Sequence, residues 1–214
     1  MIRRITLRAA LAATLIASAM PALAGAQKEE HLTASVVAGL AKAIADAPVP
    51  PDYASRPELA AWIGEMSRRI AHKVADERER RELLATTYYE ATRAGLDPQL
   101  MLAVMYHESG FKKYAFSSAQ ARGYMQVMPF WVKQIGSSDQ NLFNLRTNLR
   151  YGAVILRHYL DIENGDYYRA LGRYNGSLGQ PDYPTAVIAA MSRYFGYTPI
   201  AATAINTVAV PSPR

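Results

Sequence analysis

The sequence predicts an all-α domain of about six or seven helices over residues 56–197. Apolar residues recur in this region at the spacing of a helix face, whereas few stretches alternate with the period of two that marks a strand. Prolines at helix starts and glycines at helix stops separate the apolar segments. Half of the 214 residues are apolar and a fifth are charged, which is typical of a globular protein. The length suits one domain with an extension at each end.

The first 24 residues have the three parts of a secretory signal peptide. Three arginines lie within the first eight residues, an apolar run of about a dozen residues follows at 9–20, and a small-residue cleavage site ends at Ala24. The run is shorter than the roughly 20 residues that cross a bilayer, so an uncleaved anchor or a buried helix is the weaker alternative. We expect cleavage after Ala24, or failing that after Ala26, and export of the mature chain.

Cysteine is absent from the chain, which excludes several classes of protein. The chain cannot form a disulfide scaffold, a thiolate zinc site or an iron–sulfur cluster, and it has neither a cysteine nucleophile nor the cysteine of a lipoprotein anchor.

Loss of the signal peptide removes three arginines and no acid, so the formal net charge falls from +6 to +3. This mild charge suits an anionic polymer outside the membrane and does not argue for nucleic acid as a partner. The four histidines have no short metal-ligand spacing, so we expect neither a metal nor a cofactor.

Two extensions flank the predicted domain. Residues 25–55 are rich in alanine and end in a proline cluster at 48–51, which is typical of a linker or an extended arm. A short helix around residues 32–44 fits the sequence of this arm. Residues 198–214 are mostly Ala, Val, Thr and Pro without a charge before Arg214, and we expect them to form a flexible tail.

Helical periodicity begins at Ser55, which we expect to cap a helix whose first turn holds Pro57. One apolar face of this segment recurs every four residues, at Trp62, Met66, Ile70 and Val74. The charged run 76–82 is typical of a solvated helix surface. The apolar period then continues through Leu83, Leu84, Tyr88 and Ala91 until Gly95, a natural helix stop.

A second set of helices follows Asp97-Pro98, which supplies a cap and a proline for a first turn. The helix that begins there is apolar nearly all round, so we expect it to be buried and to stop near Gly110. Residues 111–128 are rich in Ser, Gly and aromatics and are expected to form a loop. Four more helices are predicted, at 129–135, 147–162, 166–174 and 184–195.

Glu108 is the first candidate for chemistry because it ends this buried helix. Apolar and aromatic residues flank it, and such surroundings disfavour the ionised form of a carboxyl group. A carboxylic acid that is protonated near neutral pH is what a general acid must be. The alternative is a helix-end glutamate that faces solvent or joins a structural ion pair.

Three motifs follow one another at a characteristic spacing. They are Glu108-Ser109 with Ser117 nine residues after Glu108, Gly123-Tyr124-Met125-Gln126 with Pro129, and Tyr174-Asn175-Gly176. In order and spacing the chain resembles the soluble lytic transglycosylases, whose catalytic (SLT) domain has a goose-lysozyme-like helical fold. The stretch 148–160 is similar to the helix that joins the second and third motifs in that family. The resemblance covers residues 88–190, about half of the chain.

The chain departs from the family pattern at two positions near the second motif. It has Gln120-Ala121 where Gly-Ala is usual, and Tyr124 where Leu is usual. In the third motif, Gly176 follows Asn175 directly. We expect the departures at Gln120 and Tyr124 to lie beside the cleft and to affect substrate fit more than chemistry, since Glu108 and Gln126 are intact.

The resemblance implies a reaction on peptidoglycan glycan strands in a periplasm. The β-1,4 bond between N-acetylmuramic acid and N-acetylglucosamine breaks, and the muramyl C6 hydroxyl closes on C1 to give a 1,6-anhydro end. Glu108 would act first as general acid and then as general base. The usual glycosidase scheme needs two carboxylates, and no second one falls in the matched motifs.

The resemblance also implies supporting roles for five residues, each with a structural alternative. Tyr174 would hold the Glu108 carboxylate and orient the acetamido group, or else pack in the core. Gln126 would contact sugar groups, or else cap a turn. Ser117 would bond to Glu108 or a sugar, or else stabilise a local turn, and Asn175 would bind substrate or cap a helix. Met125 is a candidate for substrate binding, although packing beside the cleft is the stronger alternative to contact with a sugar.

Two other functions stay open on the sequence. One is a goose-type lysozyme that hydrolyses the same bond, and the other is a non-catalytic protein that binds the wall or assists a secretion machine. The intact Glu108 argues against the non-catalytic alternative. We expect a monomer, with the arm at 25–55 as the one spare surface for cell-envelope or secretion machinery.

Overall fold

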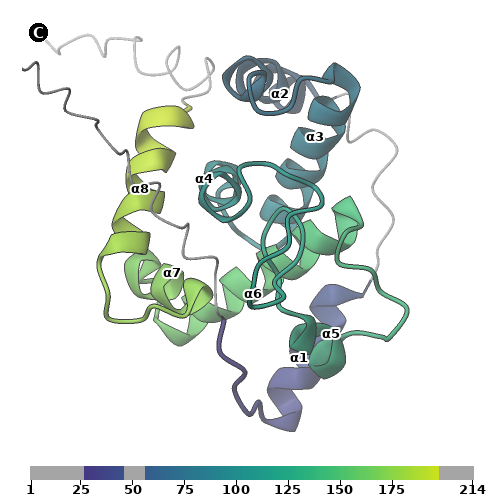
Figure 1. Cartoon of the computed structure of the whole chain (residues 1–214), viewed down its shortest axis with the longest axis vertical. Coiled ribbons are helices and arrows are strands. Elements are labelled where there is room, and N and C mark those ends of the chain that lie inside the picture. The colour runs from purple at the N-terminus through teal and green to yellow at the C-terminus, as the bar shows by residue number, and fades with distance from the viewer. Residues whose placement is uncertain (1–26, 46–55, 198–214) are drawn as a thin grey trace, which may run out of the picture.

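The computed structural model describes residues 27–45 and 56–197, and this part of the chain forms eight α-helices and no named strand (Figure 1). In chain order they are α1 (Ala34–Ile44), α2 (Pro57–Ile70), α3 (Glu77–Arg93), α4 (Pro98–Glu108), α5 (Pro129–Ile135), α6 (Leu145–Ile162), α7 (Tyr167–Asn175) and α8 (Asp182–Tyr194). The predicted all-α class is confirmed. The signal peptide, the proline cluster and the tail fall outside the described residues.

Helix α4 lies near the middle of the molecule, between α8 on one side and α3 on the other (Figure 1). Its residues 100–105 are all buried, as expected for a helix that is apolar nearly all round. Helix α2 pairs with α3, and α6 packs against α3 and α7. Burying α4 on all sides places its last residue, Glu108, at the end of a rigid central element.

The helices begin where side chains can accept the first free backbone N–H groups. Asp76, Asp97, Asn144 and Asp166 each cap the helix that follows them. The prediction that Ser55 caps this helix is wrong. The N-cap of α2 is Arg56, whose side chain makes no capping hydrogen bond. Pro57 explains the start, since its fixed φ suits a first helical turn and it has no N–H to satisfy.

The region of residues 56–95 contains two helices joined by a tight turn. The expected apolar face is confirmed, since Trp62, Met66, Ile70 and Val74 are all buried, although α2 ends at Ile70. The Arg80 guanidinium holds the turn by donating to the carbonyls of Val74 and Ala75, at 2.6 and 3.0 Å, and to Ser67 Oγ. A buried face can thus continue past the helix that begins it.

The later helices follow the sequence prediction with small shifts. Helix α5 has the predicted bounds. Helix α6 begins two residues earlier than expected because the Asn144 side chain accepts from Thr147 N and sets the cap there. Helix α8 begins at Asp182, so Pro184 lies within its first turn rather than at its start. Helix α7 ends at Asn175, and Gly176 takes the left-handed conformation that closes it.

Residues 27–45 pack onto the domain through α1, which contacts α5 and α6. Gln27 is buried, and its Oε1 accepts from Trp131 Nε1 at 3.0 Å. At the other end of α1, the carbonyls of residues 43–45 accept from Arg93 and Arg150. Both arginines are anchored on the buried carboxylate of Glu90. We call Glu90, Arg93, Arg146 and Arg150 the Glu90 cluster.

Candidate active site

Glu108 is the last residue of α4, and the residue is only 8% exposed. The chain turns sharply after it, with positive φ at Gly110 (58°) and Phe111 (66°). Ser109 stabilises the turn, since its hydroxyl donates to Met105 O and accepts from Phe111 N, both at 3.2 Å. These contacts hold the carboxylate at the junction between a buried helix and a loop.

A cavity of about 660 Å³ opens over this carboxylate, and we call it the Glu108 cavity. It is lined by His72, Lys73, Tyr106, His107, Glu108, Ser109, Gly110, Lys112, Ala115, Phe116, Ser117 and Gln126. Among these described lining residues, Glu108 carries the only carboxylate. The first two motifs therefore meet around one acidic group.

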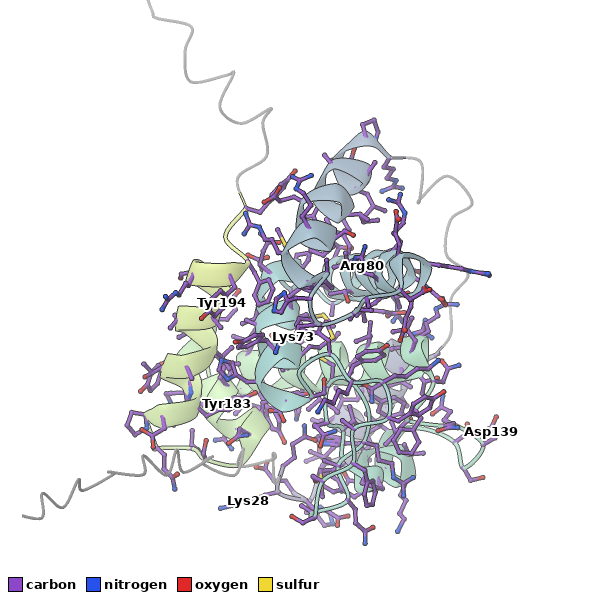
Figure 2. The ribbon with its side chains drawn as sticks, turned by 45° about the horizontal axis from the view of Figure 1, so that its top comes forward. Lys28, Lys73, Arg80, Asp139, Tyr183 and Tyr194 are labelled. Carbon is purple, nitrogen blue, oxygen red and sulfur yellow. The ribbon has the colours of Figure 1, made fainter. Side chains whose placement is uncertain are left out.

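Tyr183 contacts this carboxylate directly, and the sequence analysis did not single it out. It comes from α8 on the side that faces α4 (Figure 2), and its hydroxyl donates to Glu108 Oε1 at 2.6 Å. Burial, followed by the negative charge of Glu108, raises the pKa of Tyr183 well above its usual value. The phenol therefore stays protonated and remains a hydrogen-bond donor. No local pattern around Tyr183 signals this contact, which spans 75 residues of chain.

The negative charge of Glu108 acts on Tyr174, but the Tyr174 hydroxyl forms its hydrogen bond with the neighbouring loop. The single O–H donates to Met125 O at 2.7 Å, so it does not make the hydrogen bond to Glu108 that we expected. Complete burial is the main cause that raises the pKa of Tyr174, and the Glu108 charge adds to it. Tyr174 thus joins the second and third motifs, while Tyr183 takes the contact with the carboxylate.

Gln126 and Ser117 both line the Glu108 cavity and both stabilise its loop. The Gln126 side-chain amide donates to the carbonyls of Ala115 and Gly123, at 3.1 and 2.9 Å. Ser117 Oγ accepts from Ala121 N at 3.1 Å. These contacts match the turn-stabilising alternatives, and contact of either side chain with a sugar stays a prediction.

Asn148 of α6 holds the second motif against the helical core. Its amide oxygen accepts from Met125 N, and its amide nitrogen donates to the carbonyls of Arg122 and Leu142, each at 2.8 Å. A Cβ on Gly123, where φ is +75°, would lie 2.5 Å from the Asn148 amide nitrogen. Glycine is therefore required at this position on both conformational and steric grounds.

Met125 is fully buried and packs against Gly152 of α6, where a Cβ would lie 2.7 Å from the Met125 side chain. This packing matches the structural alternative for Met125, and its contact with a sugar stays a prediction. Tyr124, a departure from the family pattern, is also buried, and its hydroxyl donates to Glu79 Oε1 of α3 at 3.1 Å. It therefore joins the loop to α3. Gln120, the other departure, adopts a positive φ of 70°.

Asn175 and His107 come from the ends of α7 and α4. Asn175 is a buried residue at the end of α7, before the left-handed Gly176. His107 Nε2 lies 3.0 Å from Ala186 O of α8, so the ring faces that helix. Burial lowers the pKa of His107, and the contact with Ala186 partly offsets this effect. A neutral imidazole held by a backbone carbonyl is suited to packing α4 against α8.

The described residues include no group of three or more His, Cys, Asp or Glu side chains placed to hold a metal ion. None of the helices in this part of the chain combines the length and apolar character needed to span a bilayer. The groups that the structure brings together at the site are the Glu108 carboxyl group, its Tyr183 donor and the polar loop around them.

Comparison with known proteins agrees with the resemblance. Residues 86–183 match the Transglycosylase SLT domain family model, which confirms the resemblance over the segment that carries all three motifs. A protein named Transglycosylase from Enterobacteria phage PRD1 is 33% identical over 108 residues. That alignment covers 47% of this chain and 40% of the phage protein, so the chain matches less than half of that relative's length. No solved structure gave a significant match.

Proposed function

We propose, with the transglycosylase SLT domain match over residues 86–183 as premise, that this protein is a lytic transglycosylase of peptidoglycan. It cleaves the β-1,4 bond between N-acetylmuramic acid and N-acetylglucosamine and leaves a 1,6-anhydromuramyl end. The observation that carries the proposal is the position of Glu108. A nearly buried carboxyl group at the end of the central helix opens onto a cavity of about 660 Å³.

Glu108 serves as the single acid and base of the reaction. Its carboxylic acid protonates the glycosidic oxygen as the bond from that oxygen to C1 of the muramyl residue breaks. The positive charge that develops at C1 is met by the substrate's own 2-acetamido group. The muramyl C6 hydroxyl then bonds to C1 and returns its proton to the Glu108 carboxylate. Atoms and charge balance without water, and the enzyme ends in its starting protonation state.

The absence of a second acid among the described cavity residues supports this scheme over hydrolysis with two carboxylates. A glycosidase that uses two carboxylates holds them about 5–9.5 Å apart on either side of the scissile bond. Glu108 is the only carboxylate among the described residues that line its cavity. The nucleophile in our proposal is the C6 hydroxyl of the substrate, so the enzyme needs only one carboxyl group.

Tyr183 positions the catalytic carboxyl group in this proposal. Its donation to Oε1 holds the carboxyl group in place at the edge of the cavity, where the group can exchange a proton with the substrate. Gln126 and Ser117 hold the loop that forms one wall of the cavity, and their side chains are candidates for sugar contact. We place the reaction in the periplasm, on the basis of the expected signal peptide and the wall substrate, with cell-envelope machinery as a further candidate partner.

The test is mass spectrometry of the soluble fragments released from purified peptidoglycan. The wild-type protein should release muropeptides lighter by one water than the products of hydrolysis, because the ring closure replaces water addition. Glu108→Gln should release none. Glu82→Gln, an exposed change on α3, is the matched control and should act like the wild type.

Each other result points to a different function. Products at full hydrolytic mass would make the protein a lysozyme-type hydrolase. Activity that survives in Glu108→Gln would remove Glu108 from the mechanism. Binding to peptidoglycan by both proteins without turnover by either would favour the non-catalytic alternative.

A further inference from the structure

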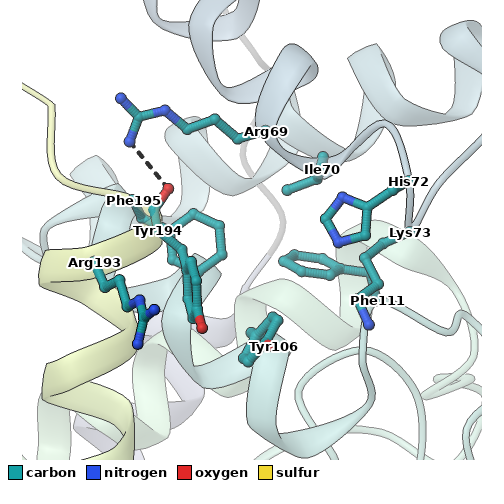
Figure 3. Close-up of a pocket in the computed structure, with 9 residues that line it drawn as sticks. All are labelled: Arg69, Ile70, His72, Lys73, Tyr106, Phe111, Arg193, Tyr194 and Phe195. Carbon is teal, nitrogen blue, oxygen red and sulfur yellow. Dashed lines mark hydrogen bonds between the residues drawn. The ribbon is translucent and has the colours of Figure 1, made fainter.

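A second cavity, of about 430 Å³, adjoins the Glu108 cavity (Figure 3). The ends of three helices form it, since its lining comes from the last turn of α2 and the residues after it, from the end of α4 and the turn after it, and from the end of α8. The lining residues are Arg69, Ile70, His72, Lys73, Tyr106, Phe111, Arg193, Tyr194 and Phe195. His72, Lys73 and Tyr106 line both cavities, so one extended ligand can occupy the two together. We call this second cavity the Lys73 pocket.

The charges in the Lys73 pocket have one sign. It contains the side chains of Arg69, Lys73 and Arg193, and none of its described lining residues carries a carboxylate. Arg69 is already used in the structure, because it pairs with Glu65 at 2.7 Å and donates to the carbonyls of Tyr194 and Gly196. The side chains of Lys73 and Arg193 form no ion pair or hydrogen bond with any residue in the described parts of the chain. Two cations are therefore available to a ligand.

Aromatic rings form most of the rest of the pocket, and each of the two cations lies over a tyrosine ring. Lys73 Nζ lies 5.6 Å from the centre of the Tyr106 ring, and the Arg193 guanidinium carbon lies 5.6 Å from that of Tyr194. Figure 3 shows Lys73 and Arg193 on opposite sides, with the tyrosine rings between them. Tyr106 contacts both Tyr194 and the buried Phe195, with ring centres 5.3 and 6.2 Å apart, which keeps these walls in place.

We propose that the Lys73 pocket binds a carboxylate of the peptide that is attached to the glycan strand. Such a peptide carries free carboxylate groups and short apolar side chains, and this chemistry matches two available cations over aromatic walls. The inference rests on the proposed function, because the peptide reaches the pocket only when its strand lies across Glu108. It makes the protein selective for peptide-bearing glycan over glycan without peptides.

The experiment compares two substrates with the protein that begins at residue 25, the form expected after export. One is a soluble glycan strand that carries its peptides, and the other is the same strand after an amidase has removed them. The wild type should process the first with a kcat/KM about tenfold higher, the effect expected of charge-assisted contacts in a partly open site. Raising the salt concentration should reduce this ratio, since the cations are exposed.

Lys73→Met and Arg193→Met keep most of the side-chain volume and remove one charge each. Each should lower the ratio of the two kcat/KM values at least threefold, and the double variant should bring it close to one. Lys133→Met removes an exposed charge from α5, outside both cavities, and is the matched control. All three positions are exposed, so circular-dichroism melting should show an intact fold in each variant.

The outcomes separate this inference from the proposed function. Turnover of both substrates at equal rates by the wild type would overturn the inference and leave the proposed function standing. An equal loss on both substrates in Lys73→Met and Arg193→Met would also overturn it. Turnover of neither substrate by the wild type would overturn the proposed function and the inference that depends on it.

Discussion

Two buried glutamates on neighbouring helices illustrate opposite uses of the same side chain. Glu90 on α3 is 1% exposed and lies among three guanidinium groups, with Arg150 Nη2 at 2.8 Å, Arg93 Nη1 at 3.2 Å and Arg146 Nε at 3.5 Å. Glu108 on α4 is 8% exposed, accepts from the neutral hydroxyl of Tyr183, and opens onto a cavity.

The difference shows which buried carboxylate is suited to proton transfer. The oxygens of Glu90 are committed to arginines that in turn hold the end of α1, so they are not presented to a ligand. Breaking such a network leaves charges buried without their partners, which is costly. The cavity gives Glu108 access to a substrate, and the Tyr183 hydroxyl fixes its position. Burial therefore does not by itself indicate a catalytic role, and the neighbours of the carboxylate are what distinguish the two cases.

The largest expected effect is on activity at Glu108. Glu108→Gln should lower turnover by roughly 10²–10⁴-fold, because it removes the group that we propose as general acid and base. Its free energy of unfolding should change by less than about 1 kcal/mol, since residues at active sites are rarely chosen for stability. Rates on soluble glycan and urea unfolding measure the two quantities. If Glu90→Gln lost as much activity while folded, the distinction between the two glutamates would fail.

The next effect is on stability at Glu90. Glu90→Gln should lower the free energy of unfolding by roughly 3–5 kcal/mol, because it leaves the buried Arg150 without its charge partner. Specific activity of the folded protein should persist. Urea denaturation measures the change, and Glu82→Gln on the exposed face of α3 should stay within about 0.5 kcal/mol of the wild type. A loss below about 1 kcal/mol would show that the Glu90 cluster does not hold the domain together.

A smaller effect is expected at Tyr183. Tyr183→Phe removes the hydroxyl that donates to Glu108, and we expect kcat to fall about tenfold while KM stays nearly constant. Steady-state kinetics on a soluble glycan substrate separate the two parameters. Tyr167→Phe is the matched control, because Tyr167 is exposed on α7 and outside the cavity. An unchanged kcat would mean that Glu108 is positioned without the tyrosine.

The smallest effect concerns two histidines, His107 next to Glu108 and His158 on the helix that carries Arg150. Burial lowers the pKa of both below 6.5 in the folded protein; for His158 the charges of Glu30 and Asp161 oppose this effect and that of Arg173 adds to it. The unfolded chain thus binds more protons than the folded chain as the pH falls below 6.5. Stability should therefore decline from pH 7 to pH 5.5, by about 1 kcal/mol or less for each histidine.

Urea unfolding at several pH values measures this decline, and His158→Gln should remove part of the slope. The window is distinct from that of the ion-paired carboxylates, because arginine partners hold the pKa of Glu65 and Glu163 below 4.5. Their contribution to stability is present above pH 4.5 and is lost only at lower pH. A slope that is the same in the wild type and in His158→Gln would assign the decline to other groups.

The sequence by itself determined the elements whose causes are local. Asp97-Pro98 predicts the start of α4, its apolar composition predicts its burial, and Gly136 follows α5 at the predicted end. Caps, prolines and helical periods act within a few residues, so a linear reading captures them. The linear reading also placed Glu108 at the end of a buried helix, and the family resemblance grouped it with Ser117 and Gln126, which line its cavity in the structure.

Only the tertiary structure decided which groups meet across long stretches of chain. Tyr183 rather than Tyr174 donates to Glu108, Glu90 gathers three arginines, and residues from α2, α4 and α8 enclose the Lys73 pocket. Both tyrosines lie near the carboxylate, and the choice between them depends on where each single O–H finds its acceptor. Such contacts form only when the packed core positions both side chains to within about an ångström. Tyr183 and Glu108 are 75 residues apart, and no local sequence pattern predicts that they meet.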